Sequence, residues 1–387
     1  MFKILTLNNI SVAGLERLPR DEYEIASELP KPDAILLRSF KMHDYEIPNT
    51  LKAIGRAGAG VNNIPLERMS ERGIVVFNAP GANANAVKEL VLTGMLLAAR
   101  NVCPAWDYVR GLDGDDEQLS QQVEAGKKQF VGFELPGRTL GVIGLGAIGV
   151  QVANVALSLG MRVIGYDPEI TVQRAWQLSS DVSQAASVGD LLAHSDFVTL
   201  HVPLVDATRG LLDGRRIELM RDGATLLNFS RDGMADETAL LAALDAGKLH
   251  AYVCDFPTTR LKGHPRTIAL PHIGASTQEA EDNCARMVAE QIKDYLQDGN
   301  ICNSVNFPDI QMPRSEGYRL AIVNANVPNM LGQISTTLAN SGLNIVDMLN
   351  KSRGNLSYTV CDVDAPISAQ VIDELAIING VMSVRML

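Results

Sequence analysis

The chain has 387 residues, of which 46% are hydrophobic and 20% charged, and its formal net charge is −11. This length predicts two or three domains, and no apolar run reaches the ~18 residues that span a bilayer. The negative charge disfavours nucleic acid or an anionic membrane as a partner. Five scattered cysteines without a CxxC pair argue against a disulfide framework and a zinc site. With an N-terminus that lacks a secretory signal, they predict a cytoplasmic protein without a metal.

The first 80 residues alternate short strand-like runs with turns, as in "KILTL", "AILLRS" and "GIVVFNAP". Such alternation predicts a parallel α/β architecture. Residues 85–112 have a long helical pattern with Asn85 as its cap, and its broad apolar face is predicted to pack partly against a second subunit. The polar stretch from residue 113 to 129 is predicted to be a solvated connection.

From about residue 137 to 276, strand and helix patterns alternate clearly, from "TLGVIGLG" to "TIALPHIGAS". This run predicts a doubly wound nucleotide-binding unit. A helical segment follows it, and prolines and charges from residue 307 to 317 indicate a linker. The last 70 residues predict a βαββαβ order, with a helix that carries Leu331, Ile334 and Leu338 on one face and a hairpin that turns at Gly354.

The motif Gly144-x-Gly146-x-x-Gly149 follows a strand and opens a helix. In that position, glycines let backbone N–H groups approach a pyrophosphate at the helix N-terminus. Asp167 ends the next strand, 23 residues (167 − 144) after the first glycine, where a carboxylate accepts the ribose hydroxyls. Because Asp167 would repel a 2′-phosphate, the motif favours NAD(H) over NADP(H).

Two further residues follow strands of this unit, where such folds place their ligands. His272, in "ALPHIGAST", is a candidate proton carrier, and Arg231, in "LLNFSRDG", is a candidate clamp for a carboxylate beside a carbonyl. A packed or solvated histidine and a surface arginine are the alternative interpretations of these two residues.

Five ordered motifs, "GRAGAGVNNI", "GVIGLGAIG…YDP", "HVPL…TRGLLD", "LLNFSRDG" and "LPHIGAST", resemble those of the D-2-hydroxyacid dehydrogenase family over nearly the whole chain. Within it, the chain is most similar to the short phosphoglycerate dehydrogenase branch, which ends in an ACT domain. The resemblance implies a Rossmann-type NAD domain (85–276), a discontinuous flavodoxin-like α/β substrate domain (1–84 and 277–306), a linker (307–316) and a ferredoxin-like βαββαβ ACT regulatory domain (317–387).

The implied reaction is NAD-dependent oxidation of D-3-phosphoglycerate to 3-phosphohydroxypyruvate, the first step of L-serine biosynthesis. The resemblance makes His272 the acid/base and Arg231 the ligand of the carboxylate and carbonyl. Its other implied site residues fall into three groups. The cofactor group is Gly144, Gly146, Ala147, Ile148, Gly149, Asp167, His201, Pro203, Thr208, Asp255 and Gly274. The substrate group is Arg38, Arg56, Ala57, Gly58, Ala59, Gly60 and Asn83, in which the two arginines are the phosphate ligands. The regulatory group, for L-serine as an effector, is Asn326 and Asn344.

The sequence departs from the family pattern near the catalytic histidine. The family has a glutamate a few residues after the aspartate of "DFP", but this chain has "DFPTTRLKG", with Arg260 and no acidic residue before His272. A carboxylate would fix the tautomer of the imidazole and stabilise its protonated form. Asn62 replaces a usual aspartate, Asn324 replaces a histidine found in some relatives, and Asn329 replaces a usual glycine.

Two alternative functions stay open. One is another D-2-hydroxyacid dehydrogenase, such as a hydroxypyruvate reductase. The other is a catalytically weakened protein that senses NAD(H) through the same fold, which the missing glutamate would explain. The resemblance also implies a homodimer or homotetramer, because small domains of the ACT type pair through their sheet edges. A C-terminal unit that serves only assembly, without a ligand, is the alternative to a serine site.

Overall fold

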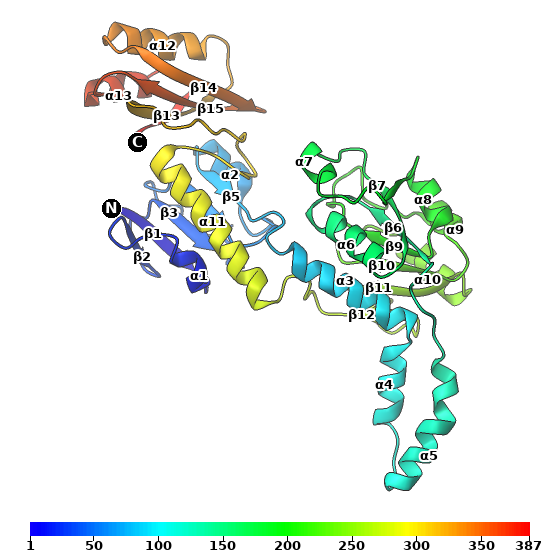
Figure 1. Cartoon of the computed structure of the whole chain (residues 1–387). Coiled ribbons are helices and arrows are strands. Elements are labelled where there is room, and N and C mark those ends of the chain that lie inside the picture. The colour runs from blue at the N-terminus through cyan, green and yellow to red at the C-terminus, as the bar shows by residue number, and fades with distance from the viewer. The chain divides into compact units, whose positions relative to one another are not determined.

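The computed structural model describes residues 1–387 as two compact units (Figure 1). One unit combines Met1–Asn83 with Gln278–Leu387, and the other is the continuous segment Ala84–Thr277. No helix has the length and apolar character needed to cross a membrane.

The first unit begins with a five-stranded parallel sheet in the order β2-β1-β3-β4-β5, which is the flavodoxin-like order. Its strands are β1 (Phe2–Leu7), β2 (Tyr23–Ala26), β3 (Ala34–Leu37), β4 (Ala53–Arg56) and β5 (Val75–Phe77), and its helices are α1 (Val12–Leu15), α2 (Leu66–Glu71) and α11 (Gln278–Asp298). The long helix α11 packs against this sheet through Val288 and Ile292, which are fully buried. Gly55 on β4 permits this close approach, because a Cβ there would lie 3.2 Å from the Ile292 side chain.

The second unit contains a seven-stranded parallel sheet in the order β12-β11-β10-β9-β6-β7-β8. Numbered from its own first strand, this is 7-6-5-4-1-2-3, the classical Rossmann order with one added edge strand. The strands are β6 (Thr139–Ile143), β7 (Arg162–Tyr166), β8 (Ser183–Gln184), β9 (Phe197–Leu200), β10 (Ala224–Asn228), β11 (Leu249–Cys254) and β12 (Thr267–Ala269). The helices between them are α6 (Ala147–Ser158), α7 (Val172–Ala175), α8 (Val188–His194), α9 (Gly214–Leu219) and α10 (Glu237–Asp245). The sequence prediction of a doubly wound nucleotide-binding unit is therefore confirmed.

The predicted helix over residues 85–112 is two helices, α3 (Ala84–Ala99) and α4 (Val102–Arg110). They separate at Asn101, whose φ of 48° is left-handed and cannot continue a helix. The predicted cap is also wrong, because Asn85 lies inside α3 and its side-chain amide donates to Glu89 one turn later.

The polar stretch that was predicted to be a solvated connection is mostly helical: α5 (Asp116–Gly126) and a short 3₁₀ turn, η1 (Lys127–Phe130). A capping box between Asp115 and Gln118 starts α5. Figure 1 shows α4 and α5 projecting from the body of their unit as an arm.

The last part of the first unit is a four-stranded antiparallel sheet in the order β14-β15-β13-β16, and the chain order is βαββαβ as predicted. The elements are β13 (Tyr318–Ala325), α12 (Met330–Asn340), β14 (Ile345–Arg353), β15 (Leu356–Val363), α13 (Ala369–Ala376) and β16 (Val381–Met386). The buried face of α12 differs by one residue from the prediction: Met330, Ile334 and Leu338 are buried, whereas Leu331 is 41% exposed.

One face of this antiparallel sheet shares a hydrophobic core with α11 and the parallel sheet. Ala321, Val323, Tyr358 and Val360 from the antiparallel sheet lie in the same cluster as Tyr295 of α11. The connecting segment joins this core, because Phe307, Ile310 and Met312 are almost fully buried. The antiparallel sheet is therefore packed on the parallel-sheet part of its unit, and the segment predicted to be a linker is partly buried in their shared core.

Candidate functional site

The turn after β6 presents backbone atoms to open space at the N-terminus of α6. Gly144 has a φ of +93°, and a Cβ there would lie 2.6 Å from the His201 carbonyl oxygen. A Cβ on Gly149 would collide with the Gly144 carbonyl oxygen, whereas one on Gly146 would meet nothing within 4 Å. Gly144 and Gly149 are thus required by packing, and Gly146 leaves room for a ligand. Ala147 and Ile148 form the first turn of α6, where a pyrophosphate is stabilised by free N–H groups.

Asp167 follows β7 and faces the same turn. Its Oδ2 accepts a hydrogen bond from the Leu145 amide at 2.8 Å, and its Oδ1 accepts one from the Glu169 amide at 2.9 Å. The carboxylate is therefore fixed beside the glycine turn, where a dinucleotide's ribose is bound in Rossmann folds.

His201 and Thr208 lie on the loop after β9. Burial lowers the pKa of His201 to about 3, so its imidazole is neutral, and its Nε2 is 2.9 Å from Thr199 Oγ1. Thr208 holds the loop closed, because its hydroxyl donates to the Pro203 carbonyl at 2.5 Å and accepts from the Val205 amide at 2.9 Å. These residues shape the wall beside the Gly144 turn.

Asp255, His272, Arg231 and Gly274 come together in the second unit. Asp255 directly follows β11 and is only 2% exposed. Burial raises the pKa of Asp255, while the charges of His272 and Arg231 and the N–H of Gly274 act against that rise. Its Oδ1 atom is buried without a hydrogen-bond partner. A buried carboxylate oxygen without a donor is a site for an amide N–H₂ group, such as the carboxamide of a nicotinamide.

The ring of His272 is placed by Phe256, a residue that the sequence reasoning did not single out. The two ring centroids lie 4.4 Å apart at 46°, while His272 itself is exposed. Phe256 belongs to the "DFP" motif beside Asp255, which is the signal that could have identified it.

Arg260, in the stretch after "DFP" where the family resemblance implies a glutamate, pairs with α10 and not with His272. Its Nη1 lies 3.2 Å from Glu237 Oε1 and 3.3 Å from Thr238 Oγ1, both at the start of α10. The carboxyl of Asp255 lies close enough to His272 for the charge of His272 to act on its pKa.

Arg231 is held by its own loop. Asn228, buried at the end of β10, donates from its amide to the Arg231 carbonyl at 2.9 Å. The guanidinium donates to the Ser230 carbonyl at 2.6 Å, and the residue is exposed. The remaining donors of its planar fork are therefore able to bind a carboxylate.

In the first unit, Arg38 and Arg56 lie at the carboxyl ends of neighbouring parallel strands, since Leu37 on β3 pairs with Arg56 on β4. Burial raises the pKa of the Cys284 thiol on α11, and Arg56 and Arg38 act in the opposite direction, so both guanidinium groups lie near this thiol. Arg38 Nη1 forms an ion pair with Glu281 Oε1 at 2.5 Å. A phosphate at Arg38 would compete with Glu281.

The loop after β4 is a tight turn of backbone. The Ala57 amide donates to the Leu37 carbonyl and the Gly58 amide to the Arg56 carbonyl, both at 2.8 Å. A Cβ on Gly58, whose φ is +150°, would collide with the Arg56 guanidinium. The Asn78 amide holds the turn by donating to the Ala59 carbonyl at 2.6 Å. Gly60 follows in the same loop, and Asn83 ends this segment of the unit.

Asn63 is a second residue that the sequence reasoning missed. Its amide donates to the carbonyls of Arg38 and Phe40 at 3.2 and 2.8 Å, so it ties the loop after β4 to the loop after β3. Asn62, the departure from the family's aspartate, is exposed.

The two asparagines predicted for an effector do not meet within one chain. Asn326 bonds to the hairpin tip, with its amide nitrogen donating to the Gly354 carbonyl at 3.0 Å. The Asn344 backbone N–H donates to Asp364 Oδ1 at 3.0 Å, beyond the other end of β15. The eight residues of β15 separate them, which is about 26 Å at a rise of ~3.3 Å per residue. Asn329, where relatives have glycine, has a φ of 64°, which asparagine tolerates.

Comparison with known proteins identifies the class. Residues 93–274 match the model of the D-isomer specific 2-hydroxyacid dehydrogenase NAD-binding domain. The chain is 34% identical over 352 residues to D-3-phosphoglycerate dehydrogenase of Haemophilus influenzae, covering 87% of this chain and 81% of the relative. The chain therefore belongs to the D-isomer specific 2-hydroxyacid dehydrogenase family, and its second unit contains that family's NAD-binding domain.

Other relatives have longer chains or lower identity. D-3-phosphoglycerate dehydrogenase of Methanocaldococcus jannaschii is 36% identical over 338 residues, which are 84% of this chain but 61% of the relative. For the next two curated relatives, the matched region is 54% and 57% of the relative's own length, so this chain spans little more than half of their length. The crystal structure of NAD⁺-bound 3-phosphoglycerate dehydrogenase from Entamoeba histolytica is similar with a TM-score of 0.61 and 26% identity, over 79% of this chain and 98% of that one.

Proposed function

We propose that this protein is an NAD-dependent dehydrogenase that oxidises D-3-phosphoglycerate to 3-phosphohydroxypyruvate, the first step of L-serine biosynthesis. The observation that carries the proposal is the pair Arg38 and Arg56 at the carboxyl ends of β3 and β4. Two cations at one strand edge suit a phosphorylated acid in a protein of net charge −11. The relatives named above support the same reaction.

In this proposal the second unit carries the reacting groups. Arg231 binds the substrate carboxylate and the oxygen on C2 through its guanidinium fork. His272 accepts the hydroxyl proton in the oxidative direction and returns it to the carbonyl oxygen in the reductive direction. Bound NAD supplies the hydride acceptor, and the residues that would hold it are the Gly144–Gly149 turn, Asp167, His201, Pro203, Thr208, Asp255 and Gly274. Asp255, whose carboxyl interacts with the charge of His272, would take the place of the missing glutamate in orienting that ring.

In the first unit, the backbone of Ala57, Gly58, Ala59 and Gly60 would bind the substrate carboxylate, and Arg38, Arg56 and Asn83 its phosphate. The proposed division is a substrate domain (1–84 and 277–306), an NAD domain (85–276), a linker (307–316) and an ACT domain (317–387). The cytoplasm is the proposed location, which agrees with five free cysteines.

One assay tests the reaction. Purified protein with 3-phosphohydroxypyruvate should oxidise NADH, and His272→Ala and Arg231→Ala should each lower kcat by roughly 10²- to 10⁴-fold. Arg215→Ala, on the exposed surface of α9, is the matched control and should keep full activity. Wild-type turnover equal to that of His272→Ala would instead favour a protein that only senses NAD(H).

A second candidate, hydroxypyruvate reduction, is favoured by one observation. The ion pair of Arg38 with Glu281 neutralises the charge of Arg38, which suits a substrate without a phosphate. Arg38→Ala should raise KM much more for 3-phosphohydroxypyruvate than for hydroxypyruvate. Equal effects on both substrates would favour the second candidate.

We infer a homodimer or homotetramer from the arm of the second unit. Helix α4 has no buried residue, and Val102, Trp106 and Val109 are 43–60% exposed. An exposed apolar surface of this kind marks an interaction site, and in a two-fold dimer the same surface of a second copy would cover it. Trp106→Glu should lower the mass measured by light scattering. Asp107→Asn, which changes an exposed charge on the same helix but removes no apolar surface, should change the mass less.

We also propose L-serine as an effector of the ACT domain. Because Asn326 and Asn344 lie at opposite ends of β15, a site that uses both needs two copies of the domain. Millimolar L-serine should change the rate or the melting temperature, and Asn344→Ala should remove that response. No response would favour a domain that serves assembly alone.

A further inference from the structure

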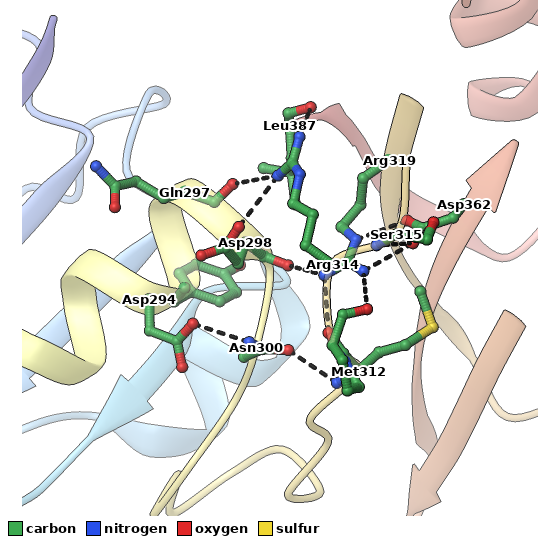
Figure 2. Close-up of polar contacts among 12 residues, drawn as sticks. Asp294, Gln297, Asp298, Asn300, Met312, Arg314, Ser315, Arg319, Asp362 and Leu387 are labelled. Atoms are coloured by element: carbon green, nitrogen blue, oxygen red, sulfur yellow. Dashed lines mark hydrogen bonds and ion pairs between the residues drawn. The ribbon is translucent and has the colours of Figure 1, made fainter. Parts of the chain in front are cut away.

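A pocket of about 530 Å³ lies where the antiparallel sheet meets the parallel-sheet part of the first unit. Phe2 of β1 and Lys52, next to β4, line it from one side, and Leu296 of α11 lies between. Arg314 and the residues Val384–Leu387 line it from the other side. Figure 2 shows Arg314, Gln297 and Leu387 at this junction. The proposed function uses none of these residues.

The charged side chains that line the pocket are all cations: Lys52, Arg314 and Arg385. Two of them have a carboxylate behind them, since Lys52 Nζ lies 2.7 Å from Asp33 Oδ1 and Arg314 Nη1 lies 3.2 Å from Asp298 Oδ1. The pocket thus combines three cations with two carboxylates, in a protein whose net charge is −11. Arg314 is also held by carbonyl oxygens of the lining, since it donates to Gln297 at 3.0 Å and to Leu387 at 2.9 Å.

Arg385 is the cation without a carboxylate partner. Its Nη2 donates to the Tyr295 carbonyl at 3.2 Å and to the Tyr358 hydroxyl at 3.4 Å. Its guanidinium lies over the Tyr295 ring, 4.1 Å from the centroid. The hydrogen-bond acceptors of this side chain are neutral, and Asp33, the ion-pair partner of Lys52, also acts on its charge. A fixed guanidinium of this kind is suited to binding an anion.

We propose that this pocket binds a small organic dianion, with its charged head at Arg385, Lys52 and Arg314 and an apolar body against Phe2 and Val384. A phosphomonoester or a dicarboxylate with a short hydrocarbon part has this chemistry. The apolar lining distinguishes such a ligand from a bare inorganic anion, because burying the hydrocarbon part adds affinity.

The pocket is separate from the candidate substrate site but lies on the same two elements. Lys52 and Arg56 are four residues apart along β4, which is about 13 Å at ~3.3 Å per residue. Glu281, the partner of Arg38, and Leu296 are 15 residues apart on α11, which is about 22 Å at ~1.5 Å per residue. An occupant would contact both sheets of the unit, and its binding would stabilise their packing.

Calorimetric titration with phenyl phosphate tests the proposal. The full chain carries Arg38→Gln in all samples, which weakens phosphate binding at the candidate substrate site. We expect phenyl phosphate to bind and to raise the melting temperature, inorganic phosphate to bind at least about tenfold more weakly, and benzyl alcohol not to bind. Arg385→Gln should lower the affinity for phenyl phosphate by about tenfold or more.

Arg353→Gln is the matched control. Arg353 also joins the antiparallel sheet to the rest of the unit, by donating to the carbonyls of Ser304 and Phe307, but it does not line the pocket. It should leave the affinity unchanged. No binding of millimolar phenyl phosphate, or equal affinity in the Arg385→Gln protein, would overturn the proposal. If Arg385→Gln does not fold, Lys52→Gln decides: weaker binding supports the site and unchanged binding refutes it.

Discussion

Arg319 and Asp362 form a buried ion pair in which Arg319 Nε and Nη2 donate to the two carboxylate oxygens at 2.6 and 2.8 Å. The remaining donors of Arg319 reach the carbonyls of Asp298, Met312 and Pro313 at 2.8–3.1 Å (Figure 2). All five guanidinium N–H groups are therefore satisfied. Burial acts to raise the pKa of Asp362, but the hydrogen bonds of Arg319 and Ser315 lower it overall.

This pair predicts a large cost for removing one partner. Arg319 is 0% exposed, so Arg319→Met leaves an unpaired buried carboxylate and three carbonyls without donors. We expect a loss of about 3–5 kcal/mol in the free energy of unfolding, measured by urea denaturation. The double variant Arg319→Met/Asp362→Leu should recover part of that loss.

Lys351→Met, on the exposed side of β14, is the control for the loss of a cation and should change stability by less than about 0.5 kcal/mol. A loss below about 1 kcal/mol in Arg319→Met would show that the pair does not hold the antiparallel sheet on α11 and the connecting segment.

Asp255 predicts opposite effects on stability and on cofactor binding. Its folded pKa is raised by burial, so the ionised carboxylate costs stability once the pH rises above that pKa. Asp255→Asn removes this cost, and the apoprotein should be about 1–2 kcal/mol more stable at pH 8, with a smaller gain at pH 4. NADH should bind roughly tenfold more weakly, because the neutral amide oxygen of asparagine is a weaker acceptor for the carboxamide than a carboxylate.

Urea denaturation without cofactor and fluorescence titration with NADH measure the two effects. Asp232→Asn, an exposed aspartate near Arg231, is the control and should alter neither. An Asp255→Asn protein that is less stable at pH 8 and binds NADH normally would remove Asp255 from the cofactor site.

His201 predicts the acid limb of the stability curve. Its pKa is lowered to about 3 in the folded state, whereas an unfolded histidine titrates near 6.5. Between these values the unfolded chain binds more protons, so stability falls as the pH falls, and the full contribution is present above pH 6.5. At pH 5 one such histidine accounts for about 2 kcal/mol.

His201→Gln should therefore lose less stability than the wild type between pH 7 and 5, as measured by urea denaturation of the apoprotein at each pH. His43→Gln, an exposed histidine of the other unit, should keep the wild-type pH dependence. Parallel curves for His201→Gln and the wild type would mean that the pKa of His201 is not lowered by folding.

The alternation of strands and helices was predictable because each strand of a parallel sheet is a short apolar run, and the runs alternate with helical patterns. The order of the strands within each sheet was implied only by the resemblance to the family. The glycine turn and Asp167 were predictable for a related reason, since a dinucleotide site is built from local backbone geometry after one strand. His272, Arg231 and Asp255 follow three different strands, and parallel pairing brings the carboxyl ends of those strands to one edge.

Two local features were missed. The break at Asn101 depends on one left-handed residue, and the capping box of α5 was visible in the sequence but lay within a polar stretch. Features that depend on distant contacts were not predictable. From the sequence alone, Arg319 would be predicted to be an exposed cation in a strand, because its partner Asp362 is 43 residues away. The ion pair of Arg260 with Glu237 likewise joins residues 23 positions apart (260 − 237). The sequence could therefore show that a glutamate is missing but not which residue the Arg260 side chain contacts.

Asp167 predicts the cofactor preference. Its carboxylate is fixed by the amides of Leu145 and Glu169, so its negative charge stays where a ribose would lie. Asp167→Ser removes the charge that repels a 2′-phosphate and an acceptor for the ribose hydroxyls. We expect KM for NADH to rise about tenfold and the preference for NADH over NADPH to fall by about tenfold or more.

Steady-state kinetics with both cofactors measure this shift. Glu169→Gln, which removes a neighbouring exposed charge but keeps the amide that binds Asp167, should leave the preference unchanged. If Asp167→Ser and Glu169→Gln shift the preference equally, the discrimination comes from the general negative potential of this surface, and the fixed carboxylate beside the Gly144 turn is not its source.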